Sequence, residues 1–458
     1  MSRCPTIIKV LCLISCAWLM PLRADSGALM KLGMEFMNKA VKDAMEESQI
    51  LEKMAAMASQ QQAGVKPIKG MTGMKVKEVT PPIITLDFLP DVGIFQCVST
   101  RITITGKSFI GGTMEIIVVV NITATNRLQQ DEATGLPMFH SEGCQIILVD
   151  VKTNLPSNML PKVVNKFLDS TLQKILPGLM CPAIDTVLEF VNQKWSHLMD
   201  PLPVGEAGSI KYILAGTPIT TANYIEVDFN PVVQREGGDT IDLTEDGATI
   251  TVLEKYPDGS SQLELSAAFF AAEFTLLQKS FDVDIKGKTI GKLPPHTTKT
   301  LARYVPRVGK AYRKSVPLMT QIRISKFKII MKPGKSQLHL HGTIEMFAVP
   351  PKSGPSSMFV LETHFSMDIQ YSLSEDKVNM TTSMDRFLDL SVESSSIGSV
   401  KVKKLKEFLT SLLQEAYVPA INGALEVGFP LPDFLGMKYG QSELAIMENA
   451  LVVDLRTP

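Results

Sequence analysis

The sequence has almost no net charge and lacks the common motifs of enzyme centres. Among 458 residues, 46 Lys and Arg stand against 47 Asp and Glu, so no basic surface for nucleic acid is expected. We find no Gly-x-Ser-x-Gly, phosphate-binding glycine loop, dinucleotide fingerprint or His-Glu-x-x-His in the chain. These absences predict a protein that is not an enzyme, needs no cofactor and does not bind nucleic acid.

Trp and Tyr are also scarce, with two and eight residues, whereas Met is frequent, with 24 residues. Hydrophobic residues make up 45% of the chain, which is typical of a globular protein with a sizeable core. Because the methionine side chain is flexible and polarizable, this composition suits an irregular core or an adaptable apolar binding site.

Beyond the first residues, the chain has no long hydrophobic run. Arg3 and Lys9 precede the apolar stretch Val10–Met20, and Ala24 offers a small residue for cleavage. This order predicts a signal peptide over residues 1–24, with a permanent signal anchor as the alternative. The longest purely aliphatic run elsewhere is Ile116–Val120, too short to cross a bilayer. We therefore expect a soluble protein of the secretory pathway, secreted or retained in the lumen of the endoplasmic reticulum.

Removal of the signal peptide leaves three cysteines, Cys97, Cys144 and Cys181, which allow one disulfide and one free thiol. Two sequons, at Asn121 and Asn379, predict glycosylation. Residues 25–200 contain 16 basic and 18 acidic side chains, so this half is not cationic.

The first half of the chain changes its hydrophobic period twice. Ser26–Glu47 carries an apolar stripe at helical spacing and predicts an amphipathic helix. After it, alternation with period two predicts strands around Ile83–Leu89, Arg101–Gly106, Met114–Asn126 and Cys144–Val151. A second helical stripe follows from Leu160 to Leu176, and Pro177 and Pro182 predict a bend or a break after it.

The second half uses the same kinds of element. Ser266–Lys279 and Lys403–Tyr417 predict helices. Between them, Leu338–Met346 and Phe359–Tyr371 alternate apolar with polar residues over long stretches, which is typical of a curved antiparallel sheet with one apolar face.

An internal repeat relates the two halves. Phe167–Gln173 aligns with Phe408–Gln414, and Pro182–Asp185 aligns with Pro419–Asn422. The order is kept through further short matches, the last of which pairs Val227–Phe229 with Val453–Leu455, so we predict a tandem duplication. The expected boundaries are 25–227 for the N-terminal domain, 228–253 for a connector and 254–458 for the C-terminal domain.

One group of residues could bind a metal. His339 and His341 lie on one face of a predicted strand together with Glu345, and His364 could join them from a neighbouring strand. The polar surface of an antiparallel sheet explains the same pattern, so we predict no metal site.

The duplicated pattern resembles the family of bactericidal/permeability-increasing protein, lipopolysaccharide-binding protein and the plasma lipid-transfer proteins (BPI/LBP/PLTP/CETP). The resemblance covers the whole chain after the signal peptide. It is strongest over Leu29–Met54, Val92–Thr105, Asn154–Ala183, Pro294–Ala302, Ser395–Gly398 and Glu415–Phe434.

The resemblance implies an α+β fold in which two antiparallel barrel-like domains, each with long helices, are joined by a central sheet into a boomerang. It also implies a disulfide between Cys144 and Cys181, which leaves Cys97 as a free, buried thiol, and it brings no catalytic residues.

The family further implies apolar pockets for phospholipids or other amphipathic lipids, with peripheral contact with membranes. We therefore expect a lipid-binding or lipid-transfer protein. The alternative is an innate-defence binder of lipopolysaccharide or other bacterial envelope lipids, which the weak charge of residues 25–200 disfavours. We predict no particular oligomeric state. The candidate lipid-contacting residues, taken from the apolar helix faces, are Leu29, Leu32, Phe36, Val163, Val164, Phe167, Leu168, Phe408, Leu409, Leu412 and Leu413.

Overall fold

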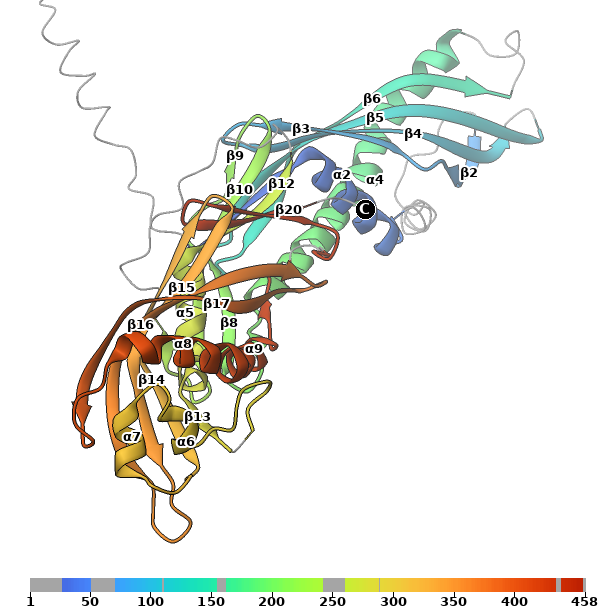
Figure 1. Ribbon diagram of the computed structural model, residues 1–458. Helices are drawn as coiled ribbons and strands as arrows, with labels where there is room; N and C mark the ends of the chain where they lie inside the picture. Colours follow the sequence, from blue (N-terminus) through green and yellow to red (C-terminus); the bar gives the residue numbers. More distant parts are fainter. Residues whose placement is uncertain are drawn as a thin grey trace, which may run out of the picture.

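The computed structural model describes residues 27–50, 71–108, 111–154, 162–241, 260–287, 289–433 and 438–455. It is an elongated, bent molecule with a curved sheet and covering helices at each end and a third sheet between them (Figure 1). The predicted signal peptide and residues 242–253 of the predicted connector lie outside the described residues. Residues 228–235 of that connector belong to a strand of the middle sheet.

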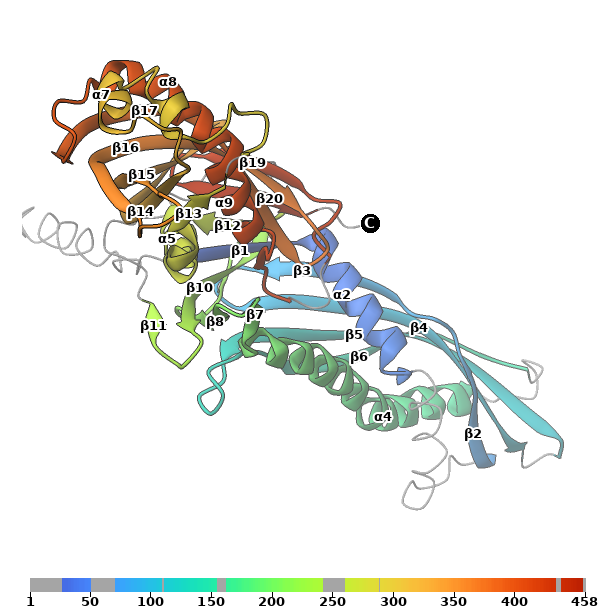
Figure 2. The ribbon, with the colours of Figure 1, turned by 60° about the horizontal axis from the view of Figure 1, so that its bottom comes forward.

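The first half forms a five-stranded antiparallel sheet in which β2 and β3 pair with β4, β4 with β5 and β5 with β6. The strands are β2 (Met71–Val79), β3 (Ile83–Leu89), β4 (Gly93–Ser108), β5 (Thr113–Gln130) and β6 (Pro137–Thr153). Every second residue of β5 is buried, so one face of the sheet builds the core. Helices α2 (Met34–Glu47) and α4 (Lys162–Ser196) cover this inner face (Figure 2).

The segment predicted as one helix, Ser26–Glu47, is a strand followed by a helix. Residues Ala28–Gly33 form β1, and α2 begins only at Met34. β1 lies between β10 (Tyr224–Arg235) and β12 (Ser261–Ser266), and all six of its residues are buried. The prediction of a helix over Leu29 and Leu32 was therefore wrong, because distant strands satisfy the backbone hydrogen bonds of this segment.

The sequence predicted a bend or a break at the prolines of the long helix, and a break is absent, since α4 continues for 35 residues with Pro177 and Pro182 inside it. Each proline removes one helical hydrogen bond. Burial of Leu172, Leu176 and Met180 against the sheet offsets that loss. By length and composition Leu172–Trp195 could cross a membrane, but this burial is typical of a core helix in a globular protein.

The second half builds a six-stranded sheet in the order β13-β14-β15-β16-β17-β18. Its strands are β13 (Val283–Lys286), β14 (Leu318–Lys332), β15 (Lys335–Ala348), β16 (Ser356–Leu373), β17 (Lys377–Ser395) and β18 (Phe429–Pro430). The long alternating strands predicted at 338–346 and 359–371 are confirmed within β15 and β16. Its helical segments are α5 (Ala267–Leu276), α6 (Thr298–Leu301), α7 (Pro306–Ala311), α8 (Val402–Leu412), the π-helix η4 (Leu413–Tyr417) and α9 (Val418–Leu425).

The middle sheet combines strands of both halves in the order β19-β20-β12-β1-β10-β8-β7, and the short strands β9 and β11 pair with β10. The remaining bounds are β7 (Leu202–Val204), β8 (Gly208–Leu214), β9 (Ile219–Thr220), β11 (Thr240–Ile241), β19 (Glu443–Met447), β20 (Ala450–Leu455) and the 3₁₀ helices η2 (His197–Met199) and η3 (Gln278–Phe281). β1 and β12 lie next to each other, and β10 and β20 flank them. This symmetric order confirms the duplicated fold, because the aligned segments Val227–Phe229 and Val453–Leu455 occupy β10 and β20.

Candidate functional site

An apolar cavity of about 50 Å³ lies between the two helices and the inner face of the first-half sheet. It is lined by Met45, Ile50, Val79, Pro82, Gln96, Val98, Thr100, Ile122, Met180, Ala183, Ile184 and Val187. Ten of these twelve side chains are apolar, so the cavity suits a hydrocarbon chain better than a charged group.

The cavity follows from the local periodicity of three elements. Gln96, Val98 and Thr100 are spaced by two along β4, so all three point to the inner face. On α4, Met180, Ala183 and Val187 are spaced by three and four, which places them on one side of the helix. Small Ala183 leaves room between helix and sheet that a larger side chain would fill.

Two polar side chains interrupt the apolar lining. The Thr100 hydroxyl donates to the carbonyl oxygen of Thr80 over 2.8 Å. Gln96 is 5% exposed, and its Oε1 accepts from Nδ2 of Asn126 over 2.7 Å. Within the described part of the chain, Asn126 Oδ1 has no partner. The Gln96–Asn126 pair therefore places an amide beside the cavity at the cost of a buried oxygen without a hydrogen bond.

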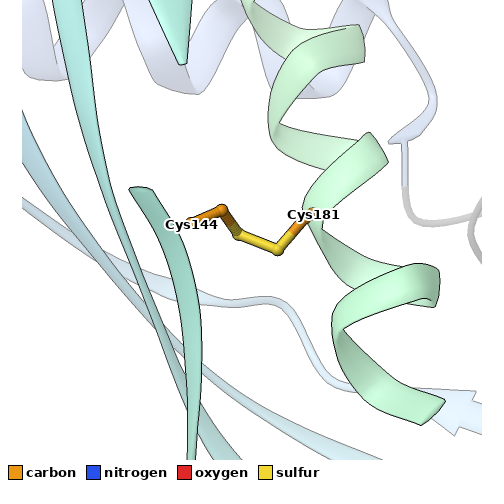
Figure 3. The surroundings of a disulfide bond; sticks show 2 residues. All are labelled: Cys144 and Cys181. Atoms are coloured by element: carbon orange, nitrogen blue, oxygen red, sulfur yellow. A yellow bond between two sulfur atoms is a disulfide. The ribbon is translucent and has the colours of Figure 1, made fainter. Parts of the chain in front are cut away.

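A disulfide between Cys144 of β6 and Cys181 of α4 fixes the helix at the cavity, with the two Cα atoms 6.0 Å apart (Figure 3). This is the pairing that the family resemblance implied. About three turns further along α4, Asn192 accepts from the backbone N–H of Phe139 and donates to its carbonyl oxygen, both over 2.9 Å. Cys97 is free but only partly buried, so the expectation of a buried thiol was wrong.

A wider hollow of about 790 Å³ lies further along α4, next to the start of β6. Its lining includes His140, Asp185 and Glu189 as well as apolar side chains. Because ionisable groups line it, this hollow is a poorer match for an acyl chain than the apolar cavity.

The sequence-based candidates of the first half lie elsewhere. Leu29 and Leu32 are buried in β1 of the middle sheet, and Phe36 is buried on α2, yet none of the three lines the cavity. The side chains of Val163, Val164, Phe167 and Leu168 lie outside the described residues, although α4 includes these positions. The lining of α4 comes instead from residues after Gly178, beyond the helical stripe Leu160–Leu176 that the sequence analysis identified.

The candidates of the second half belong to a packed core. Leu409, Leu412 and Leu413 are at most 1% exposed. The Phe408 ring stacks on the ring of His296 with centroids 6.2 Å apart, and it contacts Tyr304 at 5.3 Å. Burial lowers the pKa of His296 from 6.5 to about 4. None of the four lines the apolar cavity.

The histidines considered as metal ligands do meet on the second-half sheet. His341 of β15 and His364 of β16 are register partners with ring centroids 3.6 Å apart, and His339 lies 5.4 Å from His364. Burial, and then the charge of His341, lower the pKa values of His339 and His364. Stacked rings cannot direct their lone pairs at one ion, and within the described residues no group of His, Cys, Asp or Glu could hold a metal.

Comparison with known proteins gives matches along nearly the whole chain. The family model "LBP / BPI / CETP family, N-terminal domain" matches residues 28–191, and the C-terminal domain model matches residues 206–456. BPI fold-containing family B member 6 of Homo sapiens is 60% identical to this chain, and the match covers 98% of this chain and 100% of the human protein. The Mus musculus protein of the same name is 55% identical, over 98% of this chain and 99% of the mouse protein. The crystal structure of lipopolysaccharide binding protein matches with a TM-score of 0.59 at 19% identity, over 94% of this chain and 99% of that chain, and shows the shared fold.

Proposed function

The chain belongs to the LBP / BPI / CETP family, and we propose that it binds phospholipids or related amphipathic lipids in the cavity between α2, α4 and the first-half sheet. The observation that carries this proposal is the apolar lining of that cavity. We further propose that the protein acts in the secretory pathway as a lipid-binding or lipid-transfer protein, in peripheral contact with membranes, and not as an enzyme.

The energetic argument rests on hydrocarbon burial. Each buried CH₂ group contributes about 0.8 kcal/mol, so an acyl chain can bind without a charged clamp. A whole acyl chain needs more volume than about 50 Å³, so the cavity must widen when a lipid binds. Met45 and Met180 line the cavity, and their flexible side chains can move to provide this volume. The frequent use of Met in this sequence supports such an adaptable site.

Binding of lipopolysaccharide is the competing function. The balance of 16 basic and 18 acidic residues over positions 25–200 gives only a weak attraction to anionic lipid surfaces. A protein of this charge should bind neutral and anionic phospholipids alike, whereas a lipopolysaccharide binder should prefer the anionic lipid and lose affinity with salt.

The test is native mass spectrometry of the purified protein before and after organic extraction, for the unchanged chain and for Ala183→Leu. The substitution fills the cavity, so we expect at least a twofold loss of co-purified lipid with little change in melting temperature. The matched control is Ala40→Leu, because Ala40 is also a buried alanine on a helix of the first half but does not line the cavity. Unchanged lipid in Ala183→Leu, or no lipid in the unchanged protein, would refute the proposal.

A further inference from the structure

The outer face of the first-half sheet, opposite α2 and α4, exposes apolar side chains. On β6, Ile147 is 54% and Val149 is 55% exposed. On β5, Ile117 and Val119 lie on the partly exposed side of the strand. We call these four residues the outer strip. Since exposed neighbouring aliphatic side chains promote self-association, a secreted protein needs something to cover them.

Asn121 lies next to the outer strip. It is two residues after Val119 on β5, and its register partner on β6 is Ile147. The sequon reads Asn121-Ile122-Thr123, and because side chains alternate along a strand, Asn121 and Thr123 share the outer face while Ile122 is buried. Both polar groups of the sequon are therefore on the surface beside the exposed aliphatic side chains.

The second sequon is placed differently. Asn379 lies on β17 opposite Ser372, a polar partner. A Cβ added to Gly428 would lie 2.6 Å from Asn379 Oδ1, so this amide is held against the backbone that follows α9. Asn121 also has a polar register partner, Ser99 on β4, but its partner on β6 is the exposed Ile147, whereas the register partner of Asn379 on β16 is a serine.

We infer that Asn121 carries an N-linked glycan and that its first sugars cover the outer strip. In the transfer, Asn121 Nδ2 forms a bond to C1 of an oligosaccharide donated by a lipid-linked diphosphate. The bond from C1 to the phosphate oxygen breaks, the amide loses one proton and the lipid diphosphate leaves. The inference uses the proposed entry into the secretory pathway and is independent of lipid binding in the cavity. A glycan is bulky and solubilising, which is the property that this face needs.

The experiment expresses the full chain in a mammalian secretory host and maps its peptides after enzymatic removal of N-glycans in ¹⁸O-water. We expect the mass label of deglycosylation at Asn121 and not at Asn379. A secreted chain that is bare at Asn121 overturns the inference while leaving lipid binding open, and a chain that never enters the endoplasmic reticulum overturns both the inference and the proposed compartment.

A second measurement tests the covering role. Thr123→Ala removes the sequon and keeps Asn121, and Thr381→Ala is the matched control at the other sequon. We expect Thr123→Ala to bind a hydrophobic dye at least twofold more strongly and to self-associate, and Ile147→Thr in addition should reverse both effects. Enzymatic deglycosylation of the folded, unchanged protein repeats the test if Thr123→Ala does not fold. Equal dye binding by all forms would show that the glycan covers nothing.

Discussion

Acidification should destabilise this protein through one buried histidine in its second half. His296 is 2% exposed, its Nε2 lies 3.1 Å from the Thr320 hydroxyl, and its ring stacks on Phe408. The Thr320 hydroxyl itself donates to the sulfur of Met346, which leaves its oxygen to accept from a neutral histidine. This hydrogen bond can form in either protonation state, whereas burial favours the uncharged ring.

The size of the effect follows from the pKa, which burial lowers from 6.5 to about 4. Between these pH values the unfolded chain binds a proton that the folded chain does not. The free energy of unfolding therefore rises with pH through this window. The contribution of the neutral His296 is lost progressively as the pH falls below 6.5. From pH 7 to pH 5 the loss from His296 alone should be about 2 kcal/mol.

The assay is denaturant unfolding followed by circular dichroism at pH 7, 6 and 5, for the unchanged protein and His296→Gln. Gln cannot take up the proton but can still donate to Thr320, so its free energy of unfolding should fall by about 2 kcal/mol less over this range. His339 and His364, whose pKa values are also lowered, retain their smaller share in both proteins. The control is His140→Gln at an exposed position. The reasoning fails if His296→Gln keeps the full pH dependence of the unchanged protein.

Four further outcomes are expected. Replacing Cys144 and Cys181 by Ala should cost about 4 kcal/mol, because the bond closes a separation of 37 residues, and equal unfolding midpoints of oxidised and reduced protein would contradict this. Gln96→Leu should cost about 1–3 kcal/mol by leaving the Asn126 amide without its partner, and adding Asn126→Leu should restore part of that loss in denaturant unfolding. Phe408→Trp should overpack the second-half core, lower the free energy of unfolding by about 1–3 kcal/mol and leave the lipid content unchanged. A variant that loses lipid but keeps its melting temperature would instead show a lipid-binding site at Phe408. Binding to anionic vesicles should be weak and change less than tenfold between low and physiological salt, as a sedimentation assay can show.

Much of the fold could be predicted from the sequence because its signals are local or repeated. The alternation in β15 and β16 fixes which side chains face inward, and the repeat relates β10 to β20. The predictions failed at β1 and α4, where contacts with residues distant in the sequence determine the secondary structure. Leu29 and Leu32 fit a helix or a strand equally well until β10 and β12 are known to lie on either side.

The cavity was missed for a related reason. A proline inside a helix usually ends or kinks it, so the sequence predicted the apolar helix face only before Pro177 and Pro182. In the structure the disulfide at Cys181 and the bonds of Asn192 to Phe139 hold α4 on β6 on both sides of Pro182. Neither constraint can be read from hydrophobic spacing, since each depends on where β6 lies.

The two halves share a plan but differ in how they hold their helices. In the first half a single long helix is fixed to β6 by a disulfide, and small Ala183 and flexible Met180 face a space between helix and sheet. In the second half α8, η4 and α9 replace that helix, with Phe408 stacked on His296 and Tyr417 donating to the carbonyl oxygen of Phe281. A covalent bond keeps its helix in place when the space beside it opens, whereas ring stacking and hydrogen bonds hold only while the core stays packed. We therefore expect the first half to accommodate a lipid more readily, and the paired variants Ala183→Leu and Phe408→Trp measure that difference directly.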